Sequence, residues 1–354
     1  MKAFIRGTGI ISPQHTFVTT EFLKEIVISD TNFLKCIEPS YKDYLDPVMA
    51  RRMGRIVKMG IAAATEALKN AKIKMPDAII TGTALGCLGD TEKFLSAIIA
   101  DDEQFLTPTS FIQSIQNTVS AQIALQLKCM NHNFTFVHKG FSFESALLDA
   151  LMMLGENDAE NILVGGLDEM TEKNLLIYSR LNNWKKENIR SNELFTQNTE
   201  GTIAGEGAAF FVLSKNPSSN DYAKLCGIKT IYNPSTPKEI NIHIDTLLKE
   251  NSLSTDDISL ILYGMNGDTA TDNFYSQIKS QFLPNTPSGS FKHLCGEYQT
   301  SGGFAMWMAA MMLKNQMAPA VVMHSSLPVI LPIKSVLIYN NYENNHSLML
   351  AEKV

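Results

Sequence analysis

Apolar residues at helical spacing alternate along the chain with short runs rich in β-branched residues. Residues 51–71 carry apolar side chains every three or four positions and few helix breakers, which predicts an amphipathic helix. Residues 110–127 show the same spacing and predict a second helix. Runs at 2–12 and 78–80 are typical of strands, and a loop of small residues follows at 81–89.

The middle of the chain has a strand–helix–strand order. Residues 134–137 predict a short strand, Lys139 and Gly140 a turn, and residues 142–154 a helix. Residues 162–166 then predict a buried strand. Because strands that alternate with helices pair in parallel, with the helices on the sheet faces, the pattern favours an α/β protein.

The C-terminal part repeats this plan. Its predicted elements are strands at 208–213, 258–263 and 320–323, helices at 241–251 and 303–314, and a hairpin that pairs 335–339 with 347–351 around a polar turn at 340–345. The helices at 144–154 and 303–314 are apolar nearly all round, which predicts that both are buried between layers. We therefore expect two similar halves, residues 1–215 and 216–354, stacked on shared central helices.

Composition narrows the class of protein. The 354 residues carry a formal charge of −6 and no basic cluster, which argues against a nucleic-acid surface. No run approaches the roughly 18 apolar residues that span a bilayer, and the charged N-terminus is unlike a secretory signal. Five scattered cysteines without CxxC spacing predict no disulfide framework and no zinc site, so a cytoplasmic location is expected. No cofactor is expected.

Five strings in the chain resemble, in order, β-ketoacyl-acyl-carrier-protein synthases. The strings are IRGTGIISP from residue 5, RRMGRIVKMGIAAATEAL from 51, GTALGCLGDTE from 82, GEGAAFFVL from 205 and SFKHLCGEYQTSGG from 290. The resemblance implies the thiolase fold, an α/β fold with two βαβαβαββ-type halves in five layers, αβαβα. It also implies an acyl carrier protein as a partner.

The same resemblance assigns the family's catalytic positions. Its members use a cysteine at a strand-to-helix turn, whose pKa the helix lowers, together with two histidines and a lysine. The segment TACASG…DAL aligns without a gap on residues 138–151 and puts Gly140 at the cysteine. Gly264 stands at the first histidine, Glu297 at the second, and Lys292 keeps the lysine. The family's GFGG loop corresponds to residues 340–343, which are also altered.

These substitutions remove the family's chemistry. Glycine has no nucleophile, and an ionised glutamate only accepts hydrogen bonds, so the chain alone is not expected to condense acyl units. Cys295, His138 and Asp268 remain as alternative site groups. We expect packing from Cys295, a capping role from Ser142, and turn chemistry rather than a metal from Asp268 and its neighbours.

Three functions remain open. The first is a subunit that resembles a chain-length factor and pairs with an active ketosynthase in fatty-acid, polyketide or aryl-polyene biosynthesis. Phe134, Thr135, Phe136 and Val137 would then lie at the dimer interface, and a homologue or a second copy would bind there. The second is an acyl-thioester enzyme with altered chemistry: a thioesterase, decarboxylase or acyltransferase. The third is a homodimeric scaffold or a module that binds an acyl carrier protein.

Overall fold

A ten-stranded mixed sheet dominates the computed structural model, which describes residues 2–19, 21–197, 199–324 and 326–354. The strands run in the order β10-β9-β11-β12-β8-β1-β7-β5-β3-β4, with β2 and β6 in a separate pair. The strands are β1 (Ala3–Ile11), β2 (Phe33–Leu34), β3 (Ala78–Gly82), β4 (His132–Phe136), β5 (Asn161–Asp168), β6 (Ala204–Gly205), β7 (Gly207–Ser214), β8 (Ala223–Tyr232), β9 (Leu260–Tyr263), β10 (Ser288–Ser290), β11 (Ser335–Tyr342) and β12 (Asn345–Glu352).

The helices fall before, between and after these strands. They are α1 (Pro47–Ala50), α2 (Arg55–Ala71), α3 (Leu88–Ala100), α4 (Pro108–Ser114), α5 (Thr118–Leu127), α6 (Ser142–Glu156), α7 (Glu172–Arg180), α8 (Pro237–Glu250), α9 (Thr269–Phe282), α10 (Lys292–Cys295) and α11 (Gly302–Asn315), with short 3-10 turns η1 (Tyr41–Asp43), η2 (Lys139–Phe141), η3 (Ser191–Glu193) and η4 (Thr255–Asp257).

Strand pairing repeats on the two sides of the β1–β8 contact. On one side β4, β3 and β5 are parallel, and β7 and β1 follow antiparallel. On the other side β10, β9 and β11 are parallel, and β12 and β8 follow antiparallel. The expectation of two similar halves is confirmed. A division at residue 215 would fall between β7 and β8 and stays a prediction.

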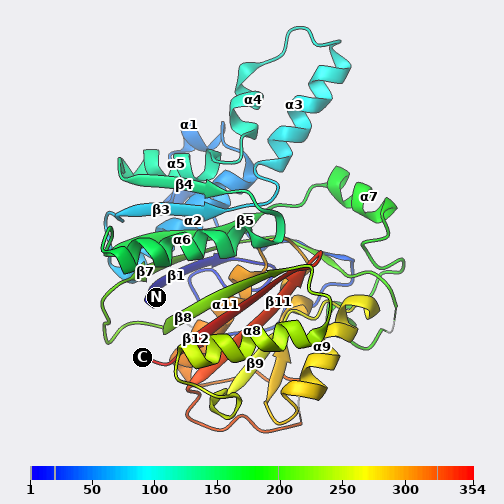
Figure 1. Ribbon diagram of the computed structural model, residues 1–354. Coiled ribbons are helices and arrows are strands. Elements are labelled where there is room, and N and C mark those ends of the chain that lie inside the picture. Colours follow the sequence, from blue (N-terminus) through cyan, green and yellow to red (C-terminus); the bar gives the residue numbers. More distant parts are fainter. Residues whose placement is uncertain (1, 20, 198, 325) are drawn as a thin grey trace.

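The elements stack in five layers (Figure 1). Helices α2 and α5 cover the outer face of the strands from β4 to β1, and α8 and α9 cover the outer face of the strands from β8 to β10. Helices α6 and α11 lie between the two sets of strands and share one core with both. In α11 every residue from Gly302 to Leu313 is buried. The αβαβα arrangement and the two buried central helices are therefore confirmed.

Small residues let the outermost helix of the first half approach its strands. A Cβ atom added at Gly9 of β1 would collide with the carbonyl oxygen of Ala63 in α2, and one at Gly7 would lie 2.6 Å from the amide nitrogen of Ala71. Glycine at these positions is required by the close approach of backbone to backbone.

Two predicted elements were wrong. Residues 110–127 form two helices, because the chain is extended at Ile115, where ψ is 144°, and α5 starts only at Thr118. Residues 320–323 form a turn in which the Val322 amide donates to the carbonyl of Pro319, and only Met323 makes a bridge, to Gly289. The short strand β10 takes the edge position instead.

The structure also contains elements that the hydrophobic pattern did not indicate: β8, α3, α7 and α9. None of the last three buries more than two side chains, and α7 and α9 carry many polar residues. The final hairpin extends further than predicted, and its turn narrows to Glu343 and Asn344. None of the helices in the described ranges is long and apolar enough to cross a bilayer.

Candidate functional site

The turn that joins β4 to α6 holds Gly140. It runs through His138, Lys139 in left-handed backbone (φ 47°), and the buried residues Gly140 and Phe141. The hydroxyl of Ser142 accepts a hydrogen bond from the His138 amide and donates one to the Lys139 carbonyl, both at 2.8 Å. Ser142 therefore closes the turn. The expected capping role is wrong, because Phe141 is the N-cap of α6 and no side-chain cap hydrogen bond is made there.

The space in front of Gly140 is filled by the β11–β12 hairpin. A Cβ atom added at Gly140 would lie 2.9 Å from the Cβ of Tyr342 and 3.1 Å from the Cβ of Asn345. Both values are shorter than ordinary carbon–carbon contacts, and both neighbours are fixed close to backbone. Position 140 has no side chain, and there is no room for one while the hairpin keeps this position.

Gly264, at the end of β9, is enclosed in the same way. A Cβ atom there would collide with the side-chain oxygen of Asn340 in β11 and would lie 3.0 Å from the hydroxyl of Tyr275 in α9. The oxygen of Asn340 and the hydroxyl of Tyr275 are both buried. Polar groups from neighbouring elements thus occupy the place of a side chain at this position.

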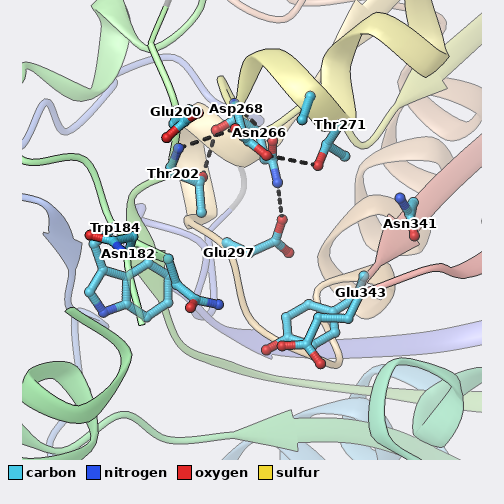
Figure 2. A pocket seen from close by; sticks show the side chains of 14 residues that line it. Asn182, Trp184, Glu200, Thr202, Asn266, Asp268, Thr271, Glu297, Asn341 and Glu343 are labelled. Atoms are coloured by element: carbon cyan, nitrogen blue, oxygen red, sulfur yellow. Dashed lines mark hydrogen bonds between the residues drawn. The ribbon is translucent and has the colours of Figure 1, made fainter. Parts of the chain in front are cut away.

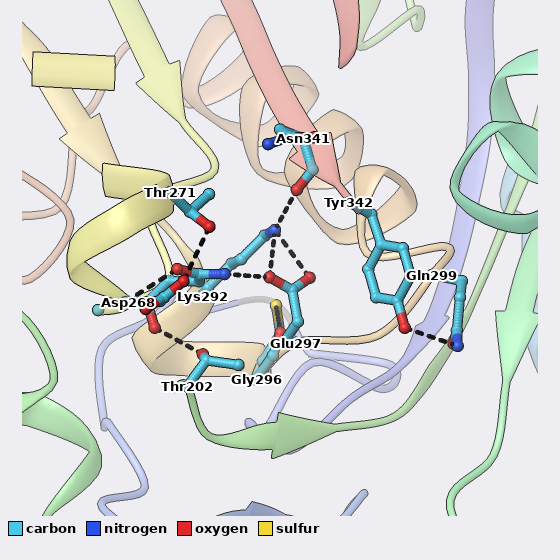
Figure 3. Close-up of polar contacts among 12 residues, drawn as sticks. Thr202, Asp268, Thr271, Lys292, Gly296, Glu297, Gln299, Asn341 and Tyr342 are labelled. Carbon is cyan, nitrogen blue, oxygen red and sulfur yellow. Dashed lines mark hydrogen bonds and ion pairs between the residues drawn. The ribbon is translucent and has the colours of Figure 1, made fainter. Parts of the chain in front are cut away.

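Lys292 and Glu297 form a buried ion pair (Figure 3). The Lys292 ammonium donates to both carboxylate oxygens of Glu297, at 2.8 and 2.7 Å, and to the carbonyl of Asn341 at 3.0 Å. The side-chain amide of Asn266 donates to the same carboxylate at 2.7 Å. Burial raises the pKa of Glu297, and the contacts from Lys292 and Asn266 oppose that rise.

A pocket of about 370 Å³ opens beside Glu297 (Figure 2). Its walls come from the loop after β9, from the hairpin and from the long segment between α7 and β6: Asn182, Asn183, Trp184, Glu200, Gly201, Thr202, Asn266, Asp268, Ala270, Thr271, Glu297, Asn341, Tyr342 and Glu343. Among these described wall residues there are four carboxylates and no lysine, arginine or histidine. Such a lining carries no cationic side chain, and its carboxylates repel an anionic thioester.

Asp268, one of the alternative site groups, stabilises the loop in which it lies. Its carboxylate accepts hydrogen bonds from the amide of Gly201 at 3.1 Å and from the hydroxyl of Thr271 at 3.0 Å. The neighbouring Asp272 accepts from the amides of Asn266 and Gly267, and burial raises its pKa to about 6. In the described part of the chain no three His, Cys, Asp or Glu side chains are grouped to hold a metal ion.

The other two alternative groups do not line this pocket. Cys295 is fully buried in the central core, and burial raises the pKa of its thiol well above the ordinary value, which disfavours a reactive thiolate. His138 is exposed, and its Nδ1 lies 3.4 Å from the hydroxyl of Ser145. Of the residues that the sequence singled out, the structure brings Glu297, Lys292 and Asp268 together. Cys295 lies beside Lys292 and Glu297 but is buried in the core, and His138 lies apart.

Sequence reasoning missed the side chains that surround Gly140 and Gly264. Tyr342 and Asn345 lie about 200 residues after Gly140, and Tyr275 belongs to a helix that the pattern did not indicate. The one available signal was the altered string at residues 340–343. It marked the hairpin as unusual without showing where its side chains point.

Comparisons with known proteins agree with this architecture. The family model described as "Beta-ketoacyl synthase, N-terminal domain" matches residues 24–218, so the chain belongs to the β-ketoacyl synthase family. A 3-oxoacyl-[acyl-carrier-protein] synthase 2 from Staphylococcus aureus (strain N315) is 22% identical over 203 residues, 53% of this chain and 49% of that protein. The chain thus spans about half the length of the curated relatives it matches.

Solved structures extend the likeness of fold to the whole chain. "The ishigamide ketosynthase/chain length factor" matches with a TM-score of 0.80 and 16% identity, covering 100% of this chain and 99% of that one. A β-ketoacyl synthase from Burkholderia phymatum STM815 matches with a TM-score of 0.80, 15% identity and the same coverage. The ketosynthase ApeO in complex with its chain length factor ApeC, from Xenorhabdus doucetiae, gives a TM-score of 0.77 and 14% identity over 99% and 98%. The resemblance drawn from the five sequence strings is confirmed.

Proposed function

We propose that this chain is a non-condensing β-ketoacyl synthase homologue that pairs with an active synthase, as a chain-length factor does, in fatty-acid, polyketide or aryl-polyene biosynthesis. The observation that carries the proposal is the packing at Gly140, where the position of the nucleophile lacks a side chain and the hairpin fills the space. Two of the similar structures pair a ketosynthase with a chain length factor in their titles.

The three altered positions together account for the lost chemistry. Removing a nucleophile from a catalytic set commonly lowers the rate by around a millionfold, and one missing oxyanion donor costs about 2.7–4 kcal/mol. At the second histidine position the carboxylate of Glu297 is already bound by Lys292 and Asn266. The retained lysine therefore supports structure at this site instead of a reacting thioester.

The edge strand β4 supports pairing with a homologous subunit. It closes one end of the ten-stranded sheet and has β3 as its single neighbour among the described strands. Phe134 and Val137 are 49% and 50% exposed, and Met130 just before the strand is 96% exposed. An uncovered apolar edge strand is a site for strand addition by another chain. An isologous interface of this kind accepts a homologue in place of an identical copy.

Co-expression with an active homologous ketosynthase tests the proposal. We expect the two chains to co-purify as a 1:1 complex, and we expect Phe134→Lys to abolish the complex without unfolding the protein. The matched control is Ile242→Lys in α8, because Ile242 is 53% exposed on the opposite outer layer. Failure to co-purify with any encoded homologue would remove the proposal, and a stable homodimer alone would favour the scaffold function.

A further inference from the structure

The pocket beside Glu297 has the size of a site for a small organic molecule, at about 370 Å³. Its walls include Trp184 from the segment between α7 and β6, Asp268 at the start of α9, and Asn341 and Glu343 from the β11–β12 hairpin. Figure 2 shows the Trp184 ring on one side of the pocket and Asn341 and Glu343 on the other. Residues far apart in the sequence thus border one cavity.

The carboxylates of this pocket differ in how far their charge is balanced. Glu297 is paired with Lys292, whose ammonium binds both of its oxygens. Among the described residues that line the pocket, no lysine, arginine or histidine accompanies Glu200, Asp268 or Glu343. Glu200 and Glu343 are exposed to solvent. Three negative charges therefore border the cavity without a cation in its described walls.

Lys185 is a cation near Asp268, with which it interacts electrostatically, but it is bound to other groups. Its ammonium donates to the carbonyl and the hydroxyl of Thr199, at 3.2 and 2.8 Å, and to the carbonyl of Gly267 at 2.9 Å. Its side chain does not line this pocket. Lys185 therefore reduces the negative charge around Asp268 and leaves the cavity itself open to a ligand.

Asn341 gives a second, independent indication of a ligand. Its side chain is 8% exposed and belongs to the pocket wall. The side-chain oxygen is buried and accepts no hydrogen bond from the residues that the structure describes. Leaving a buried acceptor without a donor is costly, and most such groups in folded proteins have a partner. The missing partner of Asn341 is a hydrogen-bond donor, which is also what the carboxylates require.

An organic amine fits these features better than a metal ion does. Within the described ranges, no three His, Cys, Asp or Glu side chains are grouped to hold a metal. Trp184 adds an aromatic ring to the wall, and it packs beside Tyr178 with the ring centroids 5.6 Å apart. An indole ring attracts an ammonium group through the negative face of its π-system. Carboxylates around an aromatic wall thus match a ligand that carries N–H donors on a hydrocarbon chain.

We propose that this pocket binds a small organic amine, with ammonium groups among Glu200, Asp268 and Glu343 and the hydrocarbon part against Trp184. The side-chain oxygen of Asn341 accepts a hydrogen bond from the same ligand. This inference goes beyond the proposed function, because it concerns the chain by itself and requires no synthase partner.

Tryptophan fluorescence of the purified chain tests the site. The sequence contains two tryptophans, and Trp307 is buried in the core, so Trp307→Phe leaves Trp184 as the reporter. The probe is putrescine, a linear diamine, and the reference ligands are 1,4-butanediol, which has the same length without charge, and Mg²⁺. We expect putrescine to change the emission saturably, to bind at least about tenfold more tightly than butanediol, and to lose affinity as salt rises. Calorimetric titration of the wild-type chain gives the affinity without the substitution.

Variants of the wall locate the ligand. Glu200→Gln combined with Glu343→Gln should weaken putrescine binding about tenfold, because two exposed carboxylates lose their charge. Asn341→Leu should weaken it about fivefold, because the acceptor is lost. The matched control is Glu156→Gln at the end of α6, an exposed carboxylate away from the pocket, which should bind putrescine as the wild type does. Urea denaturation shows whether each variant is folded.

Four results would overturn the inference. They are no binding of putrescine at millimolar concentration, equal affinity for putrescine and butanediol, the same fluorescence response to Mg²⁺ alone, and full putrescine affinity in the variant that combines Glu200→Gln with Glu343→Gln. All of these measurements use the isolated chain. Their failure would leave the pairing with a synthase untouched, and failure to co-purify with a synthase would leave the amine site standing.

Discussion

At Gly140 the backbone lies against the Cβ atoms of Tyr342 and Asn345, so the hairpin occupies the space that a side chain would need. Gly264 and Glu297 follow the same principle, because neighbouring polar side chains contact both. Restoring one family residue would therefore require the surroundings to move. The contacts that exclude a larger residue at these positions come from several elements.

Gly140→Ala is expected to destabilise the protein by about 1–3 kcal/mol, because its methyl group overpacks against the hairpin. The control is Gly89→Ala, where the nearest atom to an added Cβ is a carboxylate oxygen of Glu169 at 3.5 Å, an ordinary contact. Urea denaturation of the two variants and the wild type measures the difference. Equal stability of Gly140→Ala and wild type would show that the hairpin yields freely.

Glu144 gives the protein a pH dependence that can be isolated. It lies in the first turn of α6 and accepts a hydrogen bond from Ser347, and burial raises its pKa from an ordinary 4.5 to about 7. Between these values the folded state keeps the proton that the unfolded state has lost, so stability falls as the pH rises from 4.5 to 7. The difference is worth roughly 3 kcal/mol.

Glu144→Gln should abolish this contribution. We expect the variant to match the wild type near pH 4.5 and to exceed its stability above pH 7, since the amide carries no charge to bury. Urea denaturation at pH 4.5 and pH 8 measures the change, and Glu21→Gln, a change at an exposed side chain, is the control. A constant difference between Glu144→Gln and wild type at the two pH values would contradict the assignment.

At the scale of elements, the Lys292–Glu297 pair connects three segments of the chain. Glu297 follows α10, Asn266 follows β9, and the carbonyl of Asn341 belongs to β11. Through Asn341 the ammonium of Lys292 holds the hairpin whose Tyr342 lies over Gly140. Lys292 thus links the segment that carries Glu297 to the β11–β12 hairpin.

Glu297→Gln is expected to cost about 3–5 kcal/mol, because it leaves the Lys292 ammonium buried without a counter-charge. Replacing both partners by methionine should recover most of that loss, since no charge then remains buried. Glu250→Gln, which breaks a partly exposed pair with Lys229, should change stability by less than about 1 kcal/mol. Urea denaturation measures the free energy of unfolding of these three variants and the wild type. If Glu297→Gln were as stable as the wild type, the pair would not stabilise the hairpin.

The hydrophobic pattern predicted some of the helices and missed others. Helices α2, α6 and α11 were found because their apolar residues are numerous or strictly periodic. Helices α3 and α7 were missed because their faces are largely exposed, and the break at Ile115 was missed because apolar spacing continues across it. Periodicity reports burial, so elements with little burial leave little signal.

For the whole molecule, the order of a few sequence strings was enough to predict the fold. The observed strand order, with its two similar sets of strands around β1 and β8, agrees with that prediction. The residue types at positions 140, 264, 292 and 297 were also readable from sequence, and their correspondence to the family's catalytic residues stays a prediction. The contacts that fill those positions were not, because Gly140 meets a hairpin about 200 residues away and Gly264 meets a helix from the same half. Long-range packing of polar side chains has no periodic pattern in the chain.

The central claim is that the turn heading α6 cannot hold an acyl group. Intact-protein mass spectrometry tests it most directly: the purified chain is incubated alone with an acyl primer and malonyl units on acyl carrier protein, beside an active synthase as the positive control. We predict no added acyl mass on the chain and no extended product. An acyl adduct at residues 138–142, or extension of the primer by the chain alone, would contradict the account.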